Sequence, residues 1–188
     1  MRLFVALDIP ETARAALVEC SAQLAKTCRG PRWVRLEGAH VTLKFIGEVP
    51  DELAENIRLA LAEIHDLPPV DLRFEGLGFF PNAKRPRVLW AGIEAGPALA
   101  ELAAAVAGRL APLGIEGEAR EFRPHVTLAR LSSPEGLDPL RAAVDKLGAP
   151  EFGRATAREF YLYQSVLRPA GAEYTRLSLY AFTGESTS

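Results

Sequence analysis

An internal repeat limits the folds open to this chain. When the 188-residue sequence is shifted along itself by 85 residues without a gap, the tetrapeptide HVTL that begins at His40 falls on a second HVTL that begins at His125. The same shift places RLFVAL, from Arg2, over RVLWAG, from Arg87. Self-similarity at a fixed offset indicates a duplicated structural unit. The sequence therefore predicts two related halves, approximately residues 1–85 and 86–182.

Hydrophobic periodicity gives both halves the same order of elements. Each half begins with a strand and continues with a helix, a strand and a second helix. One further strand is expected in the first half and two in the second, near residues 159–166 and 176–182. The expected helices are residues 11–28, residues from 51 onward, 97–113 and 137–147. We therefore predict an α+β fold with two pseudo-symmetric lobes, each an antiparallel sheet with packed helices, in a single bilobal domain over residues 1–188. A central cleft where the lobes meet is the expected place for a site.

Charge and cysteine content exclude several classes of protein. Lys and Arg number 22 against 24 Asp and Glu, a formal net charge of −2, so a broad surface for long duplex nucleic acid is not expected. The apolar run at residues 3–9 is too short to span a membrane or to serve as a signal peptide. The two cysteines, Cys20 and Cys28, form no CxxC pair and fit a reducing compartment. We expect a cytoplasmic protein without membrane contact.

Two of the three histidines begin an HxT motif within the repeat. Residues i and i+2 of a strand point to the same face, so His40 and Thr42 present an imidazole beside a hydroxyl, and the second motif does the same with His125 and Thr127. The valine inside each motif faces the core. His65 lacks the threonine and lies outside the repeat, which indicates a helix-end or surface residue.

Several chemistries could use two imidazoles and two hydroxyls. A metal site would need three or four ligands, and no acidic residue shares the HxT face, so metal binding is the weaker interpretation. A nucleophilic triad lacks an orienting carboxylate. Two histidines can instead act as acid and base near neutral pH without a cofactor, while the hydroxyls donate to phosphate oxygens. Displacement at a phosphodiester is therefore the natural reaction, and purely structural histidines are the remaining alternative.

The residues after the two motifs differ. The shift of 85 residues sets Arg130 of HVTLAR against Phe45 of HVTLKF. We expect the Arg130 guanidinium to contact phosphate and the Phe45 ring to offer a face for a base. The alternative is that Phe45 is a core residue and Arg130 a charged residue at the rim. In a regular strand Arg130 would point away from the site, so a bulge or the strand end must turn it.

Longer segments resemble a known family. MRLFVALDIP, HVTLKFIGEV, GFFP, FRPHVTLAR and LYQSVLRPAGAEYTRL are similar to the bacterial and archaeal RNA 2′,3′-cyclic phosphodiesterases, also called 2′-5′ RNA ligases, which are LigT-like members of the two-histidine phosphoesterase superfamily. The likeness extends from Met1 to about Phe182.

The resemblance implies roles for the site residues. His40 would be the proton donor and His125 the proton acceptor, while Thr42, Thr127 and Arg130 hold the transition state. The implied substrate is an RNA end bearing a 2′,3′-cyclic phosphate, opened to a 2′-phosphate, and reversible 2′-5′ ligation would use the same chemistry. No ATP, metal or other cofactor is required by this scheme.

Two further functions remain open. One is a phosphodiesterase for small nucleotide cyclic phosphates, which the RNA length that stimulates turnover would separate from the first. The other is a non-catalytic module that binds RNA ends, against which the two intact HxT motifs argue.

Overall fold

The computed structural model describes residues 1–117, 121–169 and 171–184. Its α-helices are α1 (Glu11–Ala25), α2 (Asp51–Ala62), α3 (Pro97–Leu110) and α4 (Asp138–Leu147), and its 3₁₀ turns are η1 (Leu36–Gly38) and η2 (Ala111–Leu113). The strands are β1 (Arg2–Asp8), β2 (Arg32–Trp33), β3 (His40–Glu48), β4 (Val70–Phe80), β5 (Val88–Ala95), β6 (His125–Arg130), β7 (Glu151–Ala157), β8 (Glu159–Arg168) and β9 (Gly171–Ala181).

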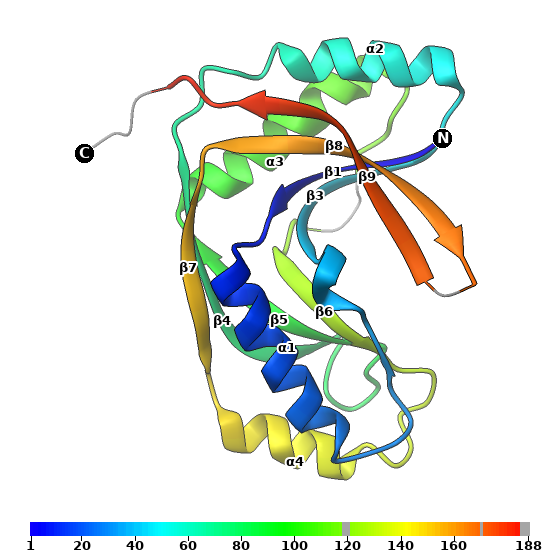
Figure 1. Cartoon of the computed structure of the whole chain (residues 1–188), viewed down its shortest axis with the longest axis vertical. Helices are drawn as coiled ribbons and strands as arrows, with labels where there is room; N and C mark the ends of the chain where they lie inside the picture. The colour runs from blue at the N-terminus through cyan, green and yellow to red at the C-terminus, as the bar shows by residue number, and fades with distance from the viewer. Residues whose placement is uncertain (118–120, 170, 185–188) are drawn as a thin grey trace.

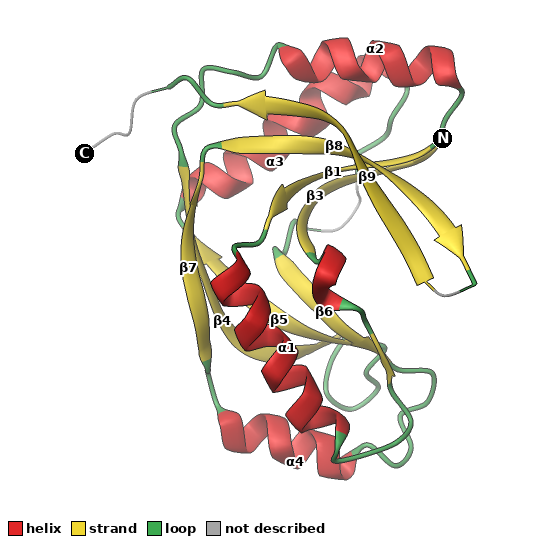
Figure 2. Cartoon of the chain, viewed as in Figure 1, coloured by secondary structure: helices red, strands yellow, loops and turns green. Residues whose placement is uncertain are grey.

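These strands form two antiparallel sheets. The first has the order β3-β1-β8-β9 and the second the order β2-β6-β5-β4-β7. Helices α2 and α3 lie with the first sheet, and α1 and α4 lie with the second (Figures 1 and 2). The prediction of an α+β fold with two helix-packed antiparallel sheets is confirmed.

The two sequence halves do not each build one lobe. Strand β1 of the first half pairs with β8 of the second half. In the other sheet, β5 and β6 of the second half pair with β4 and β2 of the first half, respectively. The helices are exchanged too, because α1 contacts β7 and α3 contacts β3. Each sheet and the helices packed on it therefore contain elements from both halves of the sequence.

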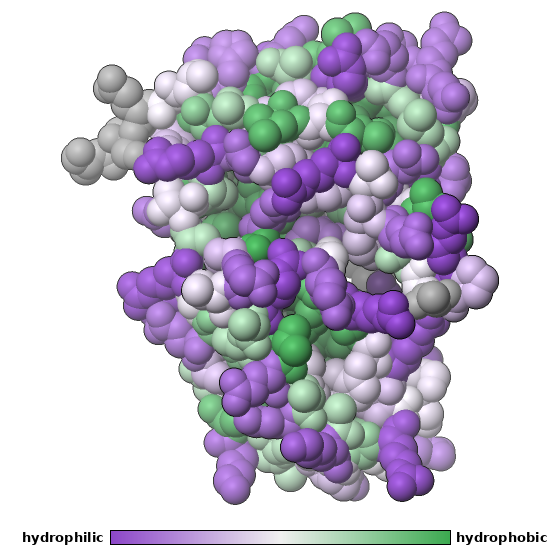
Figure 3. Space-filling view, in the orientation of Figure 1, coloured by the Kyte–Doolittle hydropathy of each residue, from purple (hydrophilic) through white to green (hydrophobic). Residues whose placement is uncertain are grey.

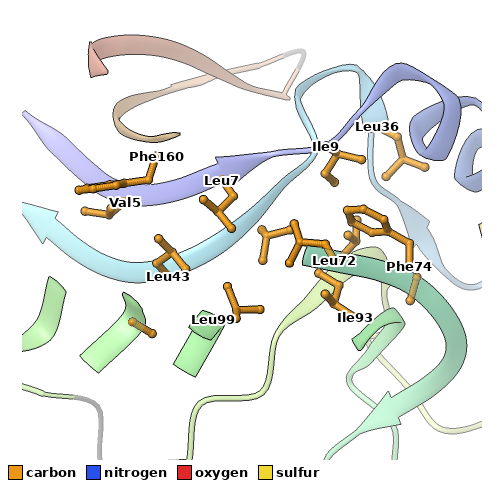
Figure 4. Close-up of a cluster of buried hydrophobic side chains, with 14 of the residues drawn as sticks. Val5, Leu7, Ile9, Leu36, Leu43, Leu72, Phe74, Ile93, Leu99 and Phe160 are labelled. Atoms are coloured by element: carbon orange, nitrogen blue, oxygen red, sulfur yellow. The ribbon is translucent and has the colours of Figure 1, made fainter. Parts of the chain in front are cut away.

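One core joins the two sheets. Leu7 and Leu43 of the first sheet belong to the same buried cluster as Leu72 and Phe74 of the second, with Leu99 of α3 packed among them (Figure 4). Each fully buried Leu or Phe side chain contributes about 1.5–3 kcal/mol relative to an exposed one. The shared core fixes the relative position of the sheets and so of any site between them.

Helix ends differ slightly from the periodicity. The first helix ends at Ala25 rather than near residue 28, and the backbone N–H and Oγ1 of Thr27 donate to the Leu24 carbonyl at 3.0 and 2.7 Å. These bonds close the last turn. No helix within the described ranges has both the length and the apolar character needed to cross a membrane.

Candidate active site

The two HxT motifs begin two strands that touch. His40 starts β3 and His125 starts β6, and these strands are in contact although they belong to different sheets (Figure 1). Val41 and Val126 are buried at 0% and 2% exposure, while each histidine and its threonine are partly exposed on the opposite strand face. The fold therefore brings both motifs to the region between the lobes, where the surface in Figure 3 is hollowed.

A bulge in β6 aims Arg130. Thr127 pairs with Trp90 and Ala129 with Leu89, so Leu128 has no partner of its own on β5. The extra residue shifts the alternation by one position. Leu128 and Ala129 are both buried at 0% exposure, and Arg130 is exposed on the same face as Thr127. The bulge that the sequence argument required is present.

An equivalent bulge in β3 exposes Phe45. Thr42 pairs with Ala6 and Lys44 with Val5, which leaves Leu43 as the extra residue. Phe45 then lies opposite Phe4 on the histidine face of the strand and is 60% exposed. Its ring is therefore available to a ligand, and the alternative of a core phenylalanine is excluded.

Both imidazoles are oriented by a backbone carbonyl two residues earlier. His40 Nδ1 lies 2.9 Å from the Gly38 oxygen, and His125 Nδ1 lies 2.7 Å from the Arg123 oxygen. A carbonyl oxygen only accepts hydrogen bonds, so each Nδ1 carries the hydrogen and donates it. In the neutral imidazole, this tautomer leaves Nε2 of each ring without a hydrogen and able to accept one.

Arg14 of α1 supports the turn that holds His40. Its guanidinium donates to the carbonyl oxygens of Leu36 and Glu37 at 2.8 and 2.5 Å and to that of Ile9 at 3.1 Å. These bonds tie helix α1 to the 3₁₀ turn η1, which ends at Gly38. Arg14 is therefore a positioning residue for the His40 ring.

Aromatic rings surround both histidines. Phe4 stacks on His40 with ring centroids 4.4 Å apart, and Tyr174 meets His40 edge-on at 5.1 Å. Phe80 meets His125 edge-on at 5.0 Å. These contacts restrict rotation of the imidazoles and partly dehydrate them.

Burial lowers the pKa of His40 below its ordinary value. The Gly38 hydrogen bond and the negative charge of Asp8 oppose that shift, whereas the positive charge of Arg14 adds to it. Asp8 itself accepts hydrogen bonds from the Tyr163 hydroxyl and the Arg176 guanidinium. Burial and the Asp8 bond raise the pKa of Tyr163 to about 12, so Tyr163 stays a neutral donor.

Sequence reasoning missed some of the residues that surround His40. Alternation along β1 puts Phe4 and Asp8 on one face, which was a usable signal, but their contacts with His40 and Tyr163 depend on strand pairing. His65 is exposed, as expected for a surface residue. Its ring Nδ1 lies 3.0 Å from Asp66 Oδ1, and its backbone carbonyl accepts hydrogen bonds from the backbone N–H and Oγ1 of Thr183.

One cavity lies away from the two histidines. A cavity of about 660 Å³ opens at the other end of the five-stranded sheet and is lined by Asp71, Arg73, Glu94, Arg154 and Thr156 among others. None of the predicted site residues lines it. The oriented histidines are the better evidence for a reactive centre.

Known proteins are similar to this chain in sequence. A family model described as the 2′-5′ RNA ligase superfamily matches residues 10–169. A protein of Archaeoglobus fulgidus named RNA 2′,3′-cyclic phosphodiesterase is 35% identical over 182 residues, which cover 96% of this chain and 99% of the relative. A Thermus thermophilus protein of the same name is 37% identical over 195 residues, with 98% of this chain and 92% of the relative covered.

Solved structures of known proteins have a similar fold. The crystal structure of TT0787 from Thermus thermophilus has a TM-score of 0.83 at 32% identity and covers 99% of this chain and 100% of that chain. The structure of Escherichia coli LigT with 3′-AMP has a TM-score of 0.78 at 28% identity, with coverage of 97% and 98%.

Proposed function

Because the chain belongs to the 2′-5′ RNA ligase superfamily, we propose that it is an enzyme that opens 2′,3′-cyclic phosphates at RNA ends to 2′-phosphomonoesters. The observation that carries the proposal is the pair of HxT histidines on two strands in contact. The Nδ1 atom of each ring donates to a backbone carbonyl, and this bond does not involve Nε2. Curated relatives named RNA 2′,3′-cyclic phosphodiesterase, matched over nearly the whole chain, support the substrate.

The proposed reaction is a displacement at phosphorus. Nε2 of His125 takes a proton from water as the water oxygen bonds to phosphorus. The bond from phosphorus to the 3′-oxygen breaks, and Nε2 of His40 gives its proton to that leaving oxygen. The products are a 2′-phosphomonoester and a free 3′-hydroxyl.

Three side chains hold the phosphate during this step. The hydroxyls of Thr42 and Thr127 donate to its non-bridging oxygens, and the Arg130 guanidinium adds a charge-assisted contact. These donors stabilise the negative charge that grows as water attacks. Phe45 offers a face on which a base can stack.

The environment of His40 suits a proton donor once substrate is bound. A lowered pKa makes the imidazolium a stronger acid but reduces its population in the empty site. The negative charge of a bound phosphate favours the imidazolium and opposes this loss. Binding and protonation of His40 are therefore coupled.

Ligation follows from the same arrangement. If the 5′-hydroxyl of another RNA replaces water, His125 deprotonates that hydroxyl and a 2′-5′ phosphodiester forms. The reaction is reversible because one phosphodiester replaces another. We propose it as a second activity of the same site.

We also propose a cytoplasmic location. Cys20 and Cys28 are both free thiols, which supports a reducing compartment.

The test uses a short RNA with a 2′,3′-cyclic phosphate, incubated with the protein in EDTA. The expected product is the 2′-phosphomonoester, identified by its phosphorus NMR shift against 2′- and 3′-phosphate standards. A 3′-phosphate, or an unchanged RNA that the protein nevertheless binds, would contradict the proposal. Turnover of 2′,3′-cyclic AMP but not of the RNA would favour the small-nucleotide alternative.

A further inference from the structure

Two arginines lie directly opposite each other beside the site. In the β2–β6 pairing Arg32 is the partner of Arg130, and both are exposed. Partners in an antiparallel ladder point to the same face with Cβ atoms about 4.5–5.5 Å apart, and like charges placed this way destabilise the sheet. Arg32 therefore adds a second guanidinium to the face that carries His125 and Thr127.

This pair of charges has no carboxylate partner within the described part of the chain. No ion pair or side-chain hydrogen bond there involves Arg32 or Arg130; the ion pairs belong to other residues. The opposite end of the same sheet differs, because Arg154 pairs with Glu151 at 2.9 Å and Arg73 with Glu75 at 2.6 Å. The unbalanced positive charge thus lies at the Arg130 end.

The loop between β4 and β5 carries further positive charge. Its Lys84 and Arg85 are exposed, and their backbone N–H groups both donate to Asn82 Oδ1, at 3.0 and 3.1 Å. Arg141 of α4 donates to the Ala83 carbonyl at 2.7 Å and so ties the loop to the domain. The loop leads directly into Val88, the β5 partner of Arg130. The anchored loop therefore carries two exposed cations on the segment that leads into β5, the strand that pairs with Arg130.

We propose that Arg32, Lys84 and Arg85 form a basic end of the site that binds the phosphodiesters adjoining the reacting terminus of an RNA strand. The proposal rests on the proposed function, in which Arg130 contacts the reacting phosphate. A single strand carries regularly spaced negative charges, and each one neutralised by Lys or Arg strengthens binding and makes it salt-dependent. The protein should accordingly prefer an oligonucleotide to a cyclic mononucleotide.

The test compares two substrates in one set of variants. Wild type and R32Q are assayed with a short oligoribonucleotide 2′,3′-cyclic phosphate and with 2′,3′-cyclic AMP. R32Q should raise KM for the oligonucleotide roughly tenfold, as for loss of one hydrogen bond to a charged group, and change KM for 2′,3′-cyclic AMP less than twofold. The plot of log kcat/KM against log salt for the oligonucleotide should flatten by about 0.7–1. The double variant K84Q/R85Q should act in the same direction.

R154Q is the matched control, since it removes an exposed, ion-paired arginine from the other edge strand of the same sheet, and it should leave both substrates unaffected. R32K, which keeps the charge, should recover most of the oligonucleotide KM. Equal losses on both substrates, or no change on either, would overturn the proposal for Arg32. Absence of turnover of both substrates by wild type would instead count against the proposed function.

Discussion

The carbonyl oxygen of Gly38 accepts a hydrogen bond from His40 Nδ1 at 2.9 Å, and the same bond recurs at 2.7 Å between Arg123 and His125. The duplication has therefore kept the backbone that orients each ring as well as the HxT residues. Because both rings present Nε2, any difference between proton donor and acceptor must come from their surroundings. His40 has Phe4 stacked on it and the Asp8 carboxylate nearby, whereas His125 has Phe80 at its edge.

Arg130 offers a test of the β6 bulge. Replacing it with alanine should lower kcat/KM about 100-fold or more, about 2.7 kcal/mol, as for loss of one oxyanion donor. Arg130→Lys should recover only part, because an ammonium cannot reproduce the guanidinium fork. Arg123→Ala is the control, since its side chain pairs with Glu121 and only its carbonyl serves the site. A change below twofold for Arg130→Ala would remove this residue from the site.

Phe45 should affect binding without affecting folding. Its ring is 60% exposed, so Phe45→Ala should change the free energy of unfolding by less than about 0.5 kcal/mol. Loss of base stacking costs about 1–3 kcal/mol, so KM for an RNA cyclic phosphate should rise roughly 5- to 150-fold. Leu59→Ala, at 53% exposure on α2, is the control. An unchanged KM would show that no base stacks on Phe45.

The pH profile should respond to Asp8. As a proton donor His40 must be protonated, so kcat/KM falls as pH rises through its pKa, which burial holds below the ordinary value. The Asp8 charge raises that pKa, so Asp8→Asn should lower it and move the alkaline fall of kcat/KM to lower pH. Asp66→Asn, beside His65, should leave the profile in place. A shift to higher pH would contradict the assignment of His40 as donor.

Arg14 should affect turnover through His40 alone. Arg14→Gln removes bonds to the carbonyls that frame η1 and should reduce kcat while KM stays nearly constant. Loss of these charge-assisted bonds should also destabilise the fold by about 1.5–3 kcal/mol, measured by denaturant unfolding. Arg58→Gln, which breaks an exposed ion pair on α2, should change neither quantity appreciably. A raised KM at unchanged kcat would contradict a positioning role.

The candidate site could be proposed from the sequence because its signal is local. The HxT alternation and the repeated register identify His40 and His125 without any knowledge of strand pairing. The alternation of side chains along a strand showed that a bulge is needed for Arg130 to face the site. The sequence could not place that bulge, because it is visible only in the pairing of β6 with β5.

Other parts of the fold depend on contacts distant in sequence. Strand β7 was not predicted, because among its residues only Phe152 is buried, and β2 has only two residues. The exchange of strands and helices between the two halves leaves no mark in local periodicity, because either pairing buries the same apolar faces. That the whole chain acts as one domain stays a prediction.

The most direct test of the account is the kcat of His40→Ala and His125→Ala on an RNA 2′,3′-cyclic phosphate, with His65→Ala as control. Loss of a general acid or base should reduce kcat by about 10²–10⁴ in each of the first two variants and leave the third at the wild-type rate. All three should keep the wild-type circular dichroism spectrum, since none of the three histidines is a buried core residue. Wild-type turnover in either His40→Ala or His125→Ala would contradict two-histidine catalysis at this site.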